Sequence, residues 1–247
     1  MNKEEKIYFP KVLIAAPQHD SKNYAFEKWF KRVQELTYPN YEVYLADNSK
    51  TKENVVNLKF RGIHAEHIAQ HEDGLIFTMA DAHNACRKYA LDNGFDYMLH
   101  LETDIIPPMD VIERLLVHRK KVVGGLYDIF YGTKRKLMVQ VSEPFDRNIR
   151  GYRVMDFIED LEPTFIDGTV KQVYHAGLGC MLISRDVLER VEFRGEKGQN
   201  FHPDTCFAND CFQLKIPIFV DTTLFCEHDN QTWLHNIDAI QEHISNK

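Results

Sequence analysis

The sequence has no cysteine pattern of the kind that builds a disulfide framework or a structural zinc site. Its cysteines are odd in number, and none of them forms a CxxC pair. Disulfide scaffolds need paired cysteines and zinc ribbons need closely spaced ones, so both classes are disfavoured and the thiols indicate a reducing compartment. The five cysteines are Cys86, Cys180, Cys206, Cys211 and Cys226.

Long apolar runs are also missing. No stretch approaches the roughly 18 apolar residues of a membrane span. The N-terminal residues 1–6 are mostly charged, and no apolar run of signal-peptide length follows them. We therefore expect no transmembrane segment and a cytoplasmic protein, which would meet a membrane only peripherally.

The chain has no excess of positive charge. It contains 30 Lys and Arg against 37 Asp and Glu, for a net charge of -7. Binding along a phosphate backbone requires basic stripes, so we expect no general nucleic-acid-binding surface. The basic run 134–136 is the best local candidate, although such runs are more often solvated loops.

What is present suits a globular α/β protein. The 247 residues are 44% hydrophobic, enough to bury a sizeable core in one large domain or two small ones. In the first half, apolar runs alternate with segments of helical spacing, which predicts a parallel sheet with right-handed crossovers. The expected strands are 12–16, 41–46 and 97–101, and the expected helices are 22–36, 72–93 and 111–118.

The second half is less regular. Residues 143–172 are rich in Pro, Gly and charge, which indicates an insertion or mobile loop. The expected strands here are 122–127, 136–141, 177–183 and 216–221, with a helical turn at 186–191.

Three candidate sites lie at the ends of expected strands: Ala16 and Pro17, Asp47 and Asn48, and Glu102 to Asp104. In parallel sheets, ligands bind at the carboxyl ends of the strands, so these residues should converge. Glu102 and Asp104 are two positions apart, and in extended backbone their carboxylates point the same way. Such a pair repels unless a cation lies between the two groups or one is protonated, and Mn²⁺ or Mg²⁺ prefers oxygen ligands. A surface acidic pair, or a cap of the following helix, is the alternative.

A late histidine supplies a third candidate ligand. His228 lies shortly after the apolar run 216–220, and imidazole suits Mn²⁺. The alternative is a surface histidine in a polar loop.

The order of these residues resembles that of GT-A glycosyltransferases, closest to the family 2 type. The resemblance covers roughly residues 10–230. It rests on the strand end at Ala16 and Pro17, the strand end at Asp47, Asn84 in a helix, the segment 102–108 and the late His228.

The resemblance implies a Rossmann-like α/β fold with a mostly parallel central sheet flanked by helices. It implies a single domain over 1–247. About 10–125 would form the nucleotide-sugar-binding half, and about 126–235 an acceptor-side half with a smaller sheet and loops. Residues 236–247 would be a C-terminal tail.

The resemblance also implies site roles. Ala16 and Pro17 would line the nucleobase and ribose pocket, and Asp47 would bind the base or ribose. Asn84 would lie at the pyrophosphate, with His83 in place of the family's usual Arg. Thr103 would also contact the donor. Gly177 would lie in a glycine-rich strand on the acceptor side, where substrate can approach the backbone closely.

Within the metal motif, the family's first Asp is replaced by Glu102. Asp104 and His228 are therefore the principal implied ligands, and Glu102 contacts the metal, the ribose or a water. For an inverting reaction, Asp204 matches the family's general base, although Pro203 replaces the Glu before it. Asp210 is the rival base, and a helix cap is the alternative role for Asp204.

Together these features predict a metal-dependent glycosyltransferase of the hexosyltransferase type. The donor would be a nucleoside diphosphate sugar, with a UDP-sugar favoured, held by Mn²⁺ or Mg²⁺. The acceptor hydroxyl would belong to a glycan, a lipid-linked group, a protein or a modified nucleic-acid base. The alternatives are a nucleotidyltransferase, whose glycine-rich basic loop is missing from residues 16–20, and a non-catalytic nucleotide-sugar or glycan-binding module.

Overall fold

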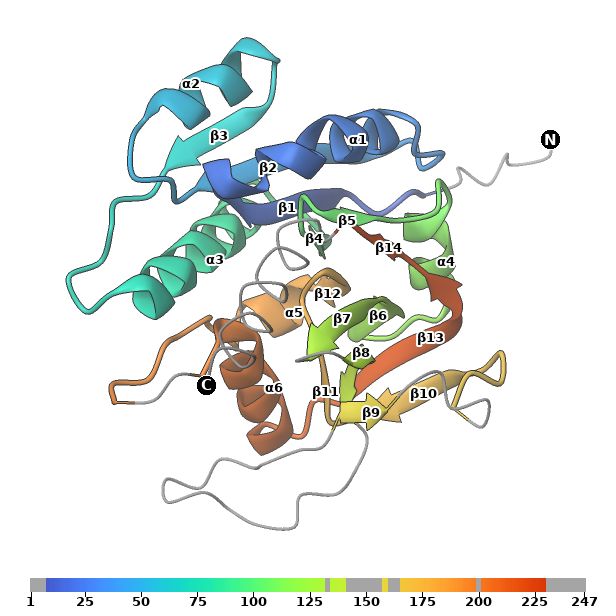
Figure 1. The fold of residues 1–247 in the computed structure, drawn as a ribbon. Helices are drawn as coiled ribbons and strands as arrows, with labels where there is room; N and C mark the ends of the chain where they lie inside the picture. Colours follow the sequence, from blue (N-terminus) through green and yellow to red (C-terminus); the bar gives the residue numbers. More distant parts are fainter. Residues whose placement is uncertain (1–7, 132–133, 141–156, 160–164, 199–200, 230–247) are drawn as a thin grey trace, which may run out of the picture.

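The computed structural model describes residues 8–131, 134–140, 157–159, 165–198 and 201–229 (Figure 1). They form an α/β fold around an eight-stranded sheet in which all strands except β10 and β12 run in one direction. The predicted fold class is confirmed. The strands are, in spatial order, β10 (Val170–Val173), β13 (Ile218–Phe225), β6 (Val122–Leu126), β12 (Cys180–Ser184), β4 (Tyr97–Leu101), β1 (Val12–Gln18), β2 (Tyr41–Asp47) and β3 (His64–His67).

Helices cover both faces of this sheet. Alternate residues of β1 point to opposite faces, as extended backbone requires: Leu13 packs in one core and Ile14 in the other. The first core takes residues of α3, α5 and α6, and the second takes residues of α1, α2 and α4. The helices are α1 (Asn23–Gln34), α2 (Glu53–Phe60), α3 (Leu75–Asp92), α4 (Val111–Val117), α5 (Arg185–Leu188) and α6 (Pro203–Gln213), with a 3₁₀ turn η1 (Asp20–Lys22).

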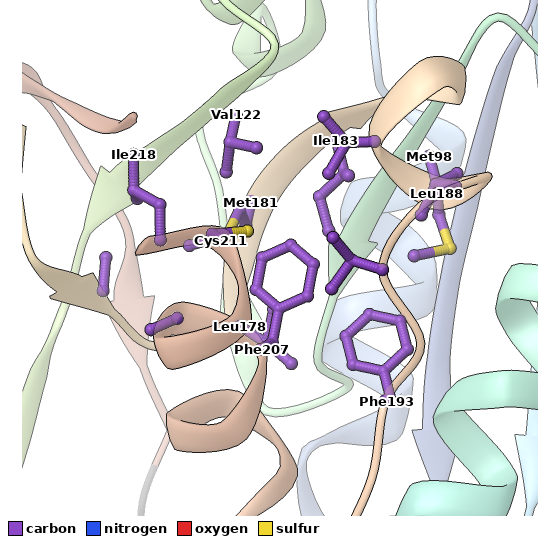
Figure 2. Packing of buried hydrophobic residues seen from close by; sticks show 14 of the residues in the cluster. Met98, Val122, Leu178, Met181, Ile183, Leu188, Phe193, Phe207, Cys211 and Ile218 are labelled. Carbon is purple, nitrogen blue, oxygen red and sulfur yellow. The ribbon is translucent and has the colours of Figure 1, made fainter. Parts of the chain in front are cut away.

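The first core fixes α6 beside the sheet. Figure 2 shows Phe207 of α6 between Cys211 and Phe193, with Met181 of β12 nearby. The rings of Phe193 and Phe207 stack with centroids 5.2 Å apart. Burial of each aromatic ring contributes roughly 1.5–3 kcal/mol, so this contact holds the start of α6 at a defined place relative to β12.

Two small sheets complete the second half. In one, β8 (Lys134–Gln140) lies between β7 (Asp128–Tyr131) and β11 (His175–Ala176), and also pairs with β9 (Phe157–Glu159). In the other, β14 (Glu227–His228) pairs with β5 (Ile105–Ile106), which sets His228 opposite Ile105. The smaller sheet expected in this half is therefore present.

Most differences from the expected boundaries have a local cause. The helix expected over 72–93 begins at Leu75, because Gly74 before it has φ 105°. The strand expected over 177–183 begins only at Cys180. Neither α2 nor β3 was expected, because their short segments have weak patterns. Most of the expected insertion at 143–172, and the expected tail at 236–247, lie outside the described residues.

Two further features bear on the sequence-based expectations. All five cysteines are buried free thiols. Within the part of the chain that the structure describes, no helix is both long enough and apolar enough to cross a bilayer.

Candidate active site

A cavity of about 500 Å³ lies at the carboxyl ends of β1 and β4, facing α3, α6 and the small sheet of β7 and β8. Two hollows of about 580 and 510 Å³ lie elsewhere on the surface, and neither touches these strand ends. The cavity is the concave site at which an open α/β sheet binds ligands. Five of the residues singled out in the sequence line it: Pro17, Glu102, Asp104, Asp204 and His228.

The carboxylates of Glu102 and Asp104 are held by an ammonium group. Lys22 Nζ lies 2.7 Å from Glu102 Oε2 and 3.0 Å from Asp104 Oδ1. Burial opposes charge on both partners, but their attraction outweighs it, raising the pKa of Lys22 and lowering the pKa of Glu102 to about 2. The cation that the carboxylate pair requires is therefore supplied by the chain itself.

His228 approaches the other oxygen of Asp104. The β5–β14 pairing places His228 Nε2 3.7 Å from Asp104 Oδ2, and Nδ1 donates a hydrogen bond to the Asp128 carbonyl at 2.6 Å. Since a carbonyl only accepts, Nδ1 carries the hydrogen and Nε2 is the atom presented to Asp104. Burial disfavours the charged ring, yet the Asp104 carboxylate outweighs it and raises the pKa of His228.

Asp104 and His228 fit a divalent cation. An ion about 2.1 Å from each ligand atom spans their 3.7 Å separation. The Nδ1 bond to a backbone carbonyl is also the arrangement that orients metal-binding histidines. Within the described residues no cluster of three or more His, Cys, Asp or Glu side chains could hold a metal. Two protein ligands would leave the remaining positions for water or phosphate oxygens.

The opposite wall contains Asp204 and His175. His175 Nε2 lies 3.7 Å from Asp204 Oδ2, and the described residues provide no hydrogen-bond partner for either ring nitrogen of this buried histidine. Burial lowers the pKa of His175, and Asp204 offsets part of that effect. Asp204 Oδ1 accepts the Thr205 N–H at 2.7 Å. Because α6 begins at Pro203, Asp204 lies in its first turn, with Oδ2 available to the cavity.

The floor of the cavity contains two stacked histidines. His100 Nδ1 lies 2.6 Å from the Leu178 carbonyl, and His100 Nε2 lies 2.8 Å from His83 Nδ1. Burial lowers the pKa of both rings, which keeps them neutral. A carbonyl oxygen only accepts, so His100 Nδ1 carries the hydrogen and His100 Nε2 is an acceptor. His83 Nδ1 therefore donates to His100 Nε2, and His83 Nε2 is left as an acceptor. His83 therefore offers a lone pair to the cavity, where an Arg would offer donors to phosphate.

Asn84, one position later, lies outside the cavity. Its side chain donates to the Phe193 carbonyl at 2.6 Å and accepts the Phe193 N–H at 3.0 Å. Both polar groups of Asn84 are thereby used to fasten residue 193 to α3.

Asp47 also lies behind the cavity wall. It is fully buried, and Oδ1 accepts hydrogen bonds from Ser49 at 2.7 Å and Asn54 at 2.8 Å. Its Oδ2 lies 3.6 Å from His67 Nδ1 without a hydrogen bond. The next residue, Asn48, lines the cavity, and its buried Oδ1 has no hydrogen-bond partner among the described residues.

Three other residues singled out in the sequence are packed away from the cavity. Ala16 is fully buried within β1, and Thr103 donates a hydrogen bond to the Gln18 side chain. Asp210 is bound by Arg194 through both carboxylate oxygens, at 2.8 and 2.9 Å. The structure thus separates the two candidate bases, since Asp204 lines the cavity and Asp210 does not.

The glycine-rich segment accommodates a tyrosine. A Cβ atom on Gly177 would lie 2.0 Å from Tyr127 Oη, and one on Gly179 would lie 2.6 Å from the same ring. Tyr127 Oη accepts the Gly179 N–H at 3.0 Å, and Tyr127 lines the cavity. The group that approaches these glycines closely is therefore a side chain of the protein.

Sequence reasoning missed Lys22 and assigned no role to His100 or Tyr127. For Lys22 a signal existed: a basic residue five positions after Pro17 lies at the same sheet edge as the acidic pair. The partners of His100 and Tyr127 are distant in sequence, and no local pattern identifies them.

No family model matches this sequence, and no curated protein matches it. Solved structures do match its fold. GalNAc-T7, solved with UDP, GalNAc and Mn²⁺, is 13% identical with a TM-score of 0.57, and the match covers 92% of this chain and 44% of that chain. The mannosyltransferase PcManGT from Pyrobaculum calidifontis, solved with GDP-Man and Mn²⁺, is 16% identical with a TM-score of 0.53, covering 90% of this chain and 57% of that chain.

A third similar structure is CMP:2-keto-3-deoxy-manno-octonic acid synthetase with CTP. It is 14% identical with a TM-score of 0.51, and the match covers 94% of this chain and 99% of that chain. This chain spans about half the length of the two glycosyltransferases that it matches. Similarity at such low identity shows the fold alone, and that fold is GT-A-like, as the resemblance predicted.

Proposed function

We propose that this chain of GT-A-like fold is a metal-dependent glycosyltransferase that moves a hexose from a nucleoside diphosphate sugar to an acceptor hydroxyl. The observation that carries the proposal is the single cavity with Asp104 and His228 on one wall and Asp204 on the other. Two proteins of similar fold were solved with Mn²⁺, one together with UDP and GalNAc and the other with GDP-Man, and this supports the proposal at the level of fold.

In this proposal the half over about 10–125 binds the nucleotide and the half over about 126–235 binds the acceptor. Pro17 and Asn48 line the cavity at the ends of β1 and β2, where the base and ribose would lie. Asp47, behind Asn48, would orient that strand end through Ser49 and Asn54. UDP is the favoured nucleotide.

Asp104 and His228 would hold the divalent ion, Mn²⁺ or Mg²⁺, and Glu102 would act with Lys22 beside it. When bound, the ion supplies Lewis-acid stabilisation of the leaving diphosphate. The chain's own contribution is to fix Asp104 Oδ2 and His228 Nε2 toward the same point before any ligand arrives.

Asp204 would act as the general base of an inverting reaction. Its Oδ2 takes the proton of the acceptor hydroxyl while that oxygen forms a bond to the anomeric carbon and the bond from this carbon to the diphosphate breaks. His175, 3.7 Å from Oδ2, would hold the carboxylate in position. The acceptor would be a glycan, a lipid-linked group, a protein or a modified base.

A donor screen tests this proposal. The purified protein is incubated with UDP-, GDP- and CMP-linked sugars and Mn²⁺, and nucleotide release is measured with and without EDTA. Release that requires the metal and is lost in Asp104→Asn supports the assignment. Full activity in EDTA contradicts the metal role. Binding of a nucleotide sugar without release from any donor would instead favour the non-catalytic binding module.

One observation favours a second function, a nucleotidyltransferase. The match to the CTP-bound synthetase covers nearly the whole of both chains. Such an enzyme would release pyrophosphate from a nucleoside triphosphate in the presence of a sugar. The same screen, run with four triphosphates and a pyrophosphate assay, separates the two reactions.

A further inference from the structure

The least expected feature of the cavity is the ammonium group between its two strand-end carboxylates. Lys22 ends η1 and immediately precedes α1, so its position is fixed by a turn and a helix start. Its side chain is 29% exposed and lines the cavity, whereas Asp104 beneath it is 1% exposed. The ammonium and the Glu102 carboxylate are therefore the more exposed groups of this cluster, and Asp104 is the buried one.

We propose that Lys22 is a diphosphate-binding residue and that, until the diphosphate arrives, its ammonium competes with a divalent cation for Glu102 and Asp104. The proposal rests on the proposed function, because it names the group of the same site that takes the donor's phosphates. It adds a second cation, one that belongs to the chain.

The hydrogen-bonding capacity of Lys22 supports this role. An ammonium has three donors, and the contacts to Glu102 and Asp104 use two of them. Within the described part of the chain the third donor has no acceptor, so it can be given to an anion in the cavity. A phosphate oxygen can take that donor without displacing Glu102, which then keeps the ammonium in place as a positioning residue.

The charges of the cavity wall also support a diphosphate-binding role for Lys22. Glu102 and Asp104 carry two negative charges where a diphosphate would approach, and like charges at such a distance repel. Lys22 cancels one of these charges, and a divalent ion on Asp104 and His228 would more than cancel the other. Each of the two cations therefore lowers the repulsion that a diphosphate meets at this wall.

The same geometry predicts competition in the absence of phosphate. Asp104 Oδ1 accepts from Lys22 while Asp104 Oδ2 faces His228. A divalent ion alone would share Asp104 with the ammonium and would be repelled by it. Removing Lys22 would leave Asp104 Oδ1 without its ammonium partner, so a divalent ion on Asp104 and His228 would meet no competing positive charge.

The experiment compares Lys22→Met with Lys28→Met. Lys28 lies on α1, the helix that follows Lys22, and pairs with Glu227 outside the cavity, so it controls for the loss of one positive charge. Two probes are used: inorganic pyrophosphate in EDTA, followed by calorimetry, and Mn²⁺ alone, followed by electron paramagnetic resonance. Pyrophosphate carries the diphosphate without a base, so the result does not depend on nucleotide identity.

The two probes should shift in opposite directions in Lys22→Met. Pyrophosphate should bind about tenfold more weakly, the effect of one charge-assisted hydrogen bond. Mn²⁺ alone should bind about tenfold more tightly, and Lys28→Met should change neither. A general loss of structure would weaken both. Unchanged pyrophosphate affinity in Lys22→Met, or Mn²⁺ binding that is no tighter, overturns the proposal.

Two further variants keep the test decisive if Lys22→Met does not fold. Lys22→Arg retains the charge and should retain pyrophosphate binding. Glu102→Gln removes one negative charge but keeps a side-chain oxygen that can accept the hydrogen bond from Lys22, so pyrophosphate should bind several-fold more tightly in EDTA, and weaker binding contradicts the proposal. Pyrophosphate binding that depends on Lys22, without release from any donor, would sustain this inference while the proposed function fails.

Discussion

The two walls of the cavity satisfy their polar groups differently. On the metal wall (Lys22, Glu102, Asp104 and His228), hydrogen bonds join the ammonium to both carboxylates and the histidine ring to a backbone carbonyl. On the base wall (His175 and Asp204), the described residues leave both ring nitrogens of a buried histidine without a hydrogen bond.

This difference indicates that contacts within the protein order the metal wall, whereas the base wall has polar groups that a ligand could bind. Ion pairs and a carbonyl hold the metal wall in place without a ligand. An unsatisfied buried polar group costs about 1–3 kcal/mol, so the base wall costs stability that a bound ligand can return. We expect substitutions on the metal wall to change ligand binding, and substitutions on the base wall to trade activity against stability.

Asp104→Asn should have the largest effect. Its Oδ2 is shared by His228 and the proposed metal ion, and its Oδ1 by Lys22, so both cations lose a partner. Loss of several kcal/mol of charge stabilisation lowers kcat by about 10³-fold or more. Nucleotide release under saturating Mn²⁺ measures the effect. Asp210→Asn, outside the cavity, serves as the control, and an equal loss there would contradict the assignment.

Asp204→Asn comes next. A general base contributes about 10²–10⁴-fold, and the amide cannot take the acceptor's proton. Donor and Mn²⁺ affinity should stay near the wild-type values, because the base wall is separate from the metal wall. Steady-state kinetics together with calorimetry separate the two effects. Equal losses of catalysis and nucleotide binding would mean that the two walls do not act separately.

His175→Phe should not lower the free energy of unfolding, although most substitutions of buried residues do. The ring is buried and its nitrogens are unpartnered, so an apolar ring of similar shape removes a polar group that has no hydrogen bond. The free energy of unfolding should stay equal or rise by about 1 kcal/mol, while kcat falls about tenfold through loss of the contact to Asp204. Denaturant unfolding measures the free energy of unfolding, and steady-state kinetics measures kcat. A destabilised variant would show that His175 has a hydrogen-bond partner in solution.

The smallest effect concerns pH. Burial lowers the pKa of His175, so the unfolded chain binds its proton near the ordinary value of 6.5 while the folded chain does not. The stability contributed by this group is present above pH 6.5 and is lost below it. The pKa of His228 is raised by Asp104, so its contribution has the opposite sign: present below pH 6.5 and lost as the pH rises above it.

Melting temperatures measured from pH 7.5 to 5.5 test this difference. The acid-induced fall should be smaller in His175→Phe than in the wild type, and larger in His228→Asn. Parallel curves for all three proteins would contradict the opposite signs.

Local pattern was sufficient to predict the frame of the fold but not all of the site. The apolar run 97–101 is β4 residue for residue, and Glu102 and Asp104 follow from its end. Lys22 depends on the turn that directs its side chain back across the sheet edge. The histidine floor depends on contacts between α3, β4 and the loop at Leu178, which no single segment encodes.

Other differences come from packing between distant segments. Asn84 had the polarity of a ligand-binding residue, yet the backbone at Phe193 takes both of its polar groups. The glycines at 177 and 179 had the openness of a substrate-binding strand, yet Tyr127 fills that space. Sequence shows which residues are able to bind; the competing partners inside the protein decide which remain free to do so.

The hydrogen bond from His100 to Leu178 has a consequence for redesign of this cavity. The acceptor is a main-chain oxygen, so every amino acid at position 178 presents the same atom while the loop keeps its path. The hydrogen-bond acceptor that His83 presents to a ligand therefore does not depend on the side chain at position 178. A hydrogen-bond donor in place of this acceptor requires replacement of His83 or His100, because no substitution at Leu178 changes which ring nitrogens donate and which accept.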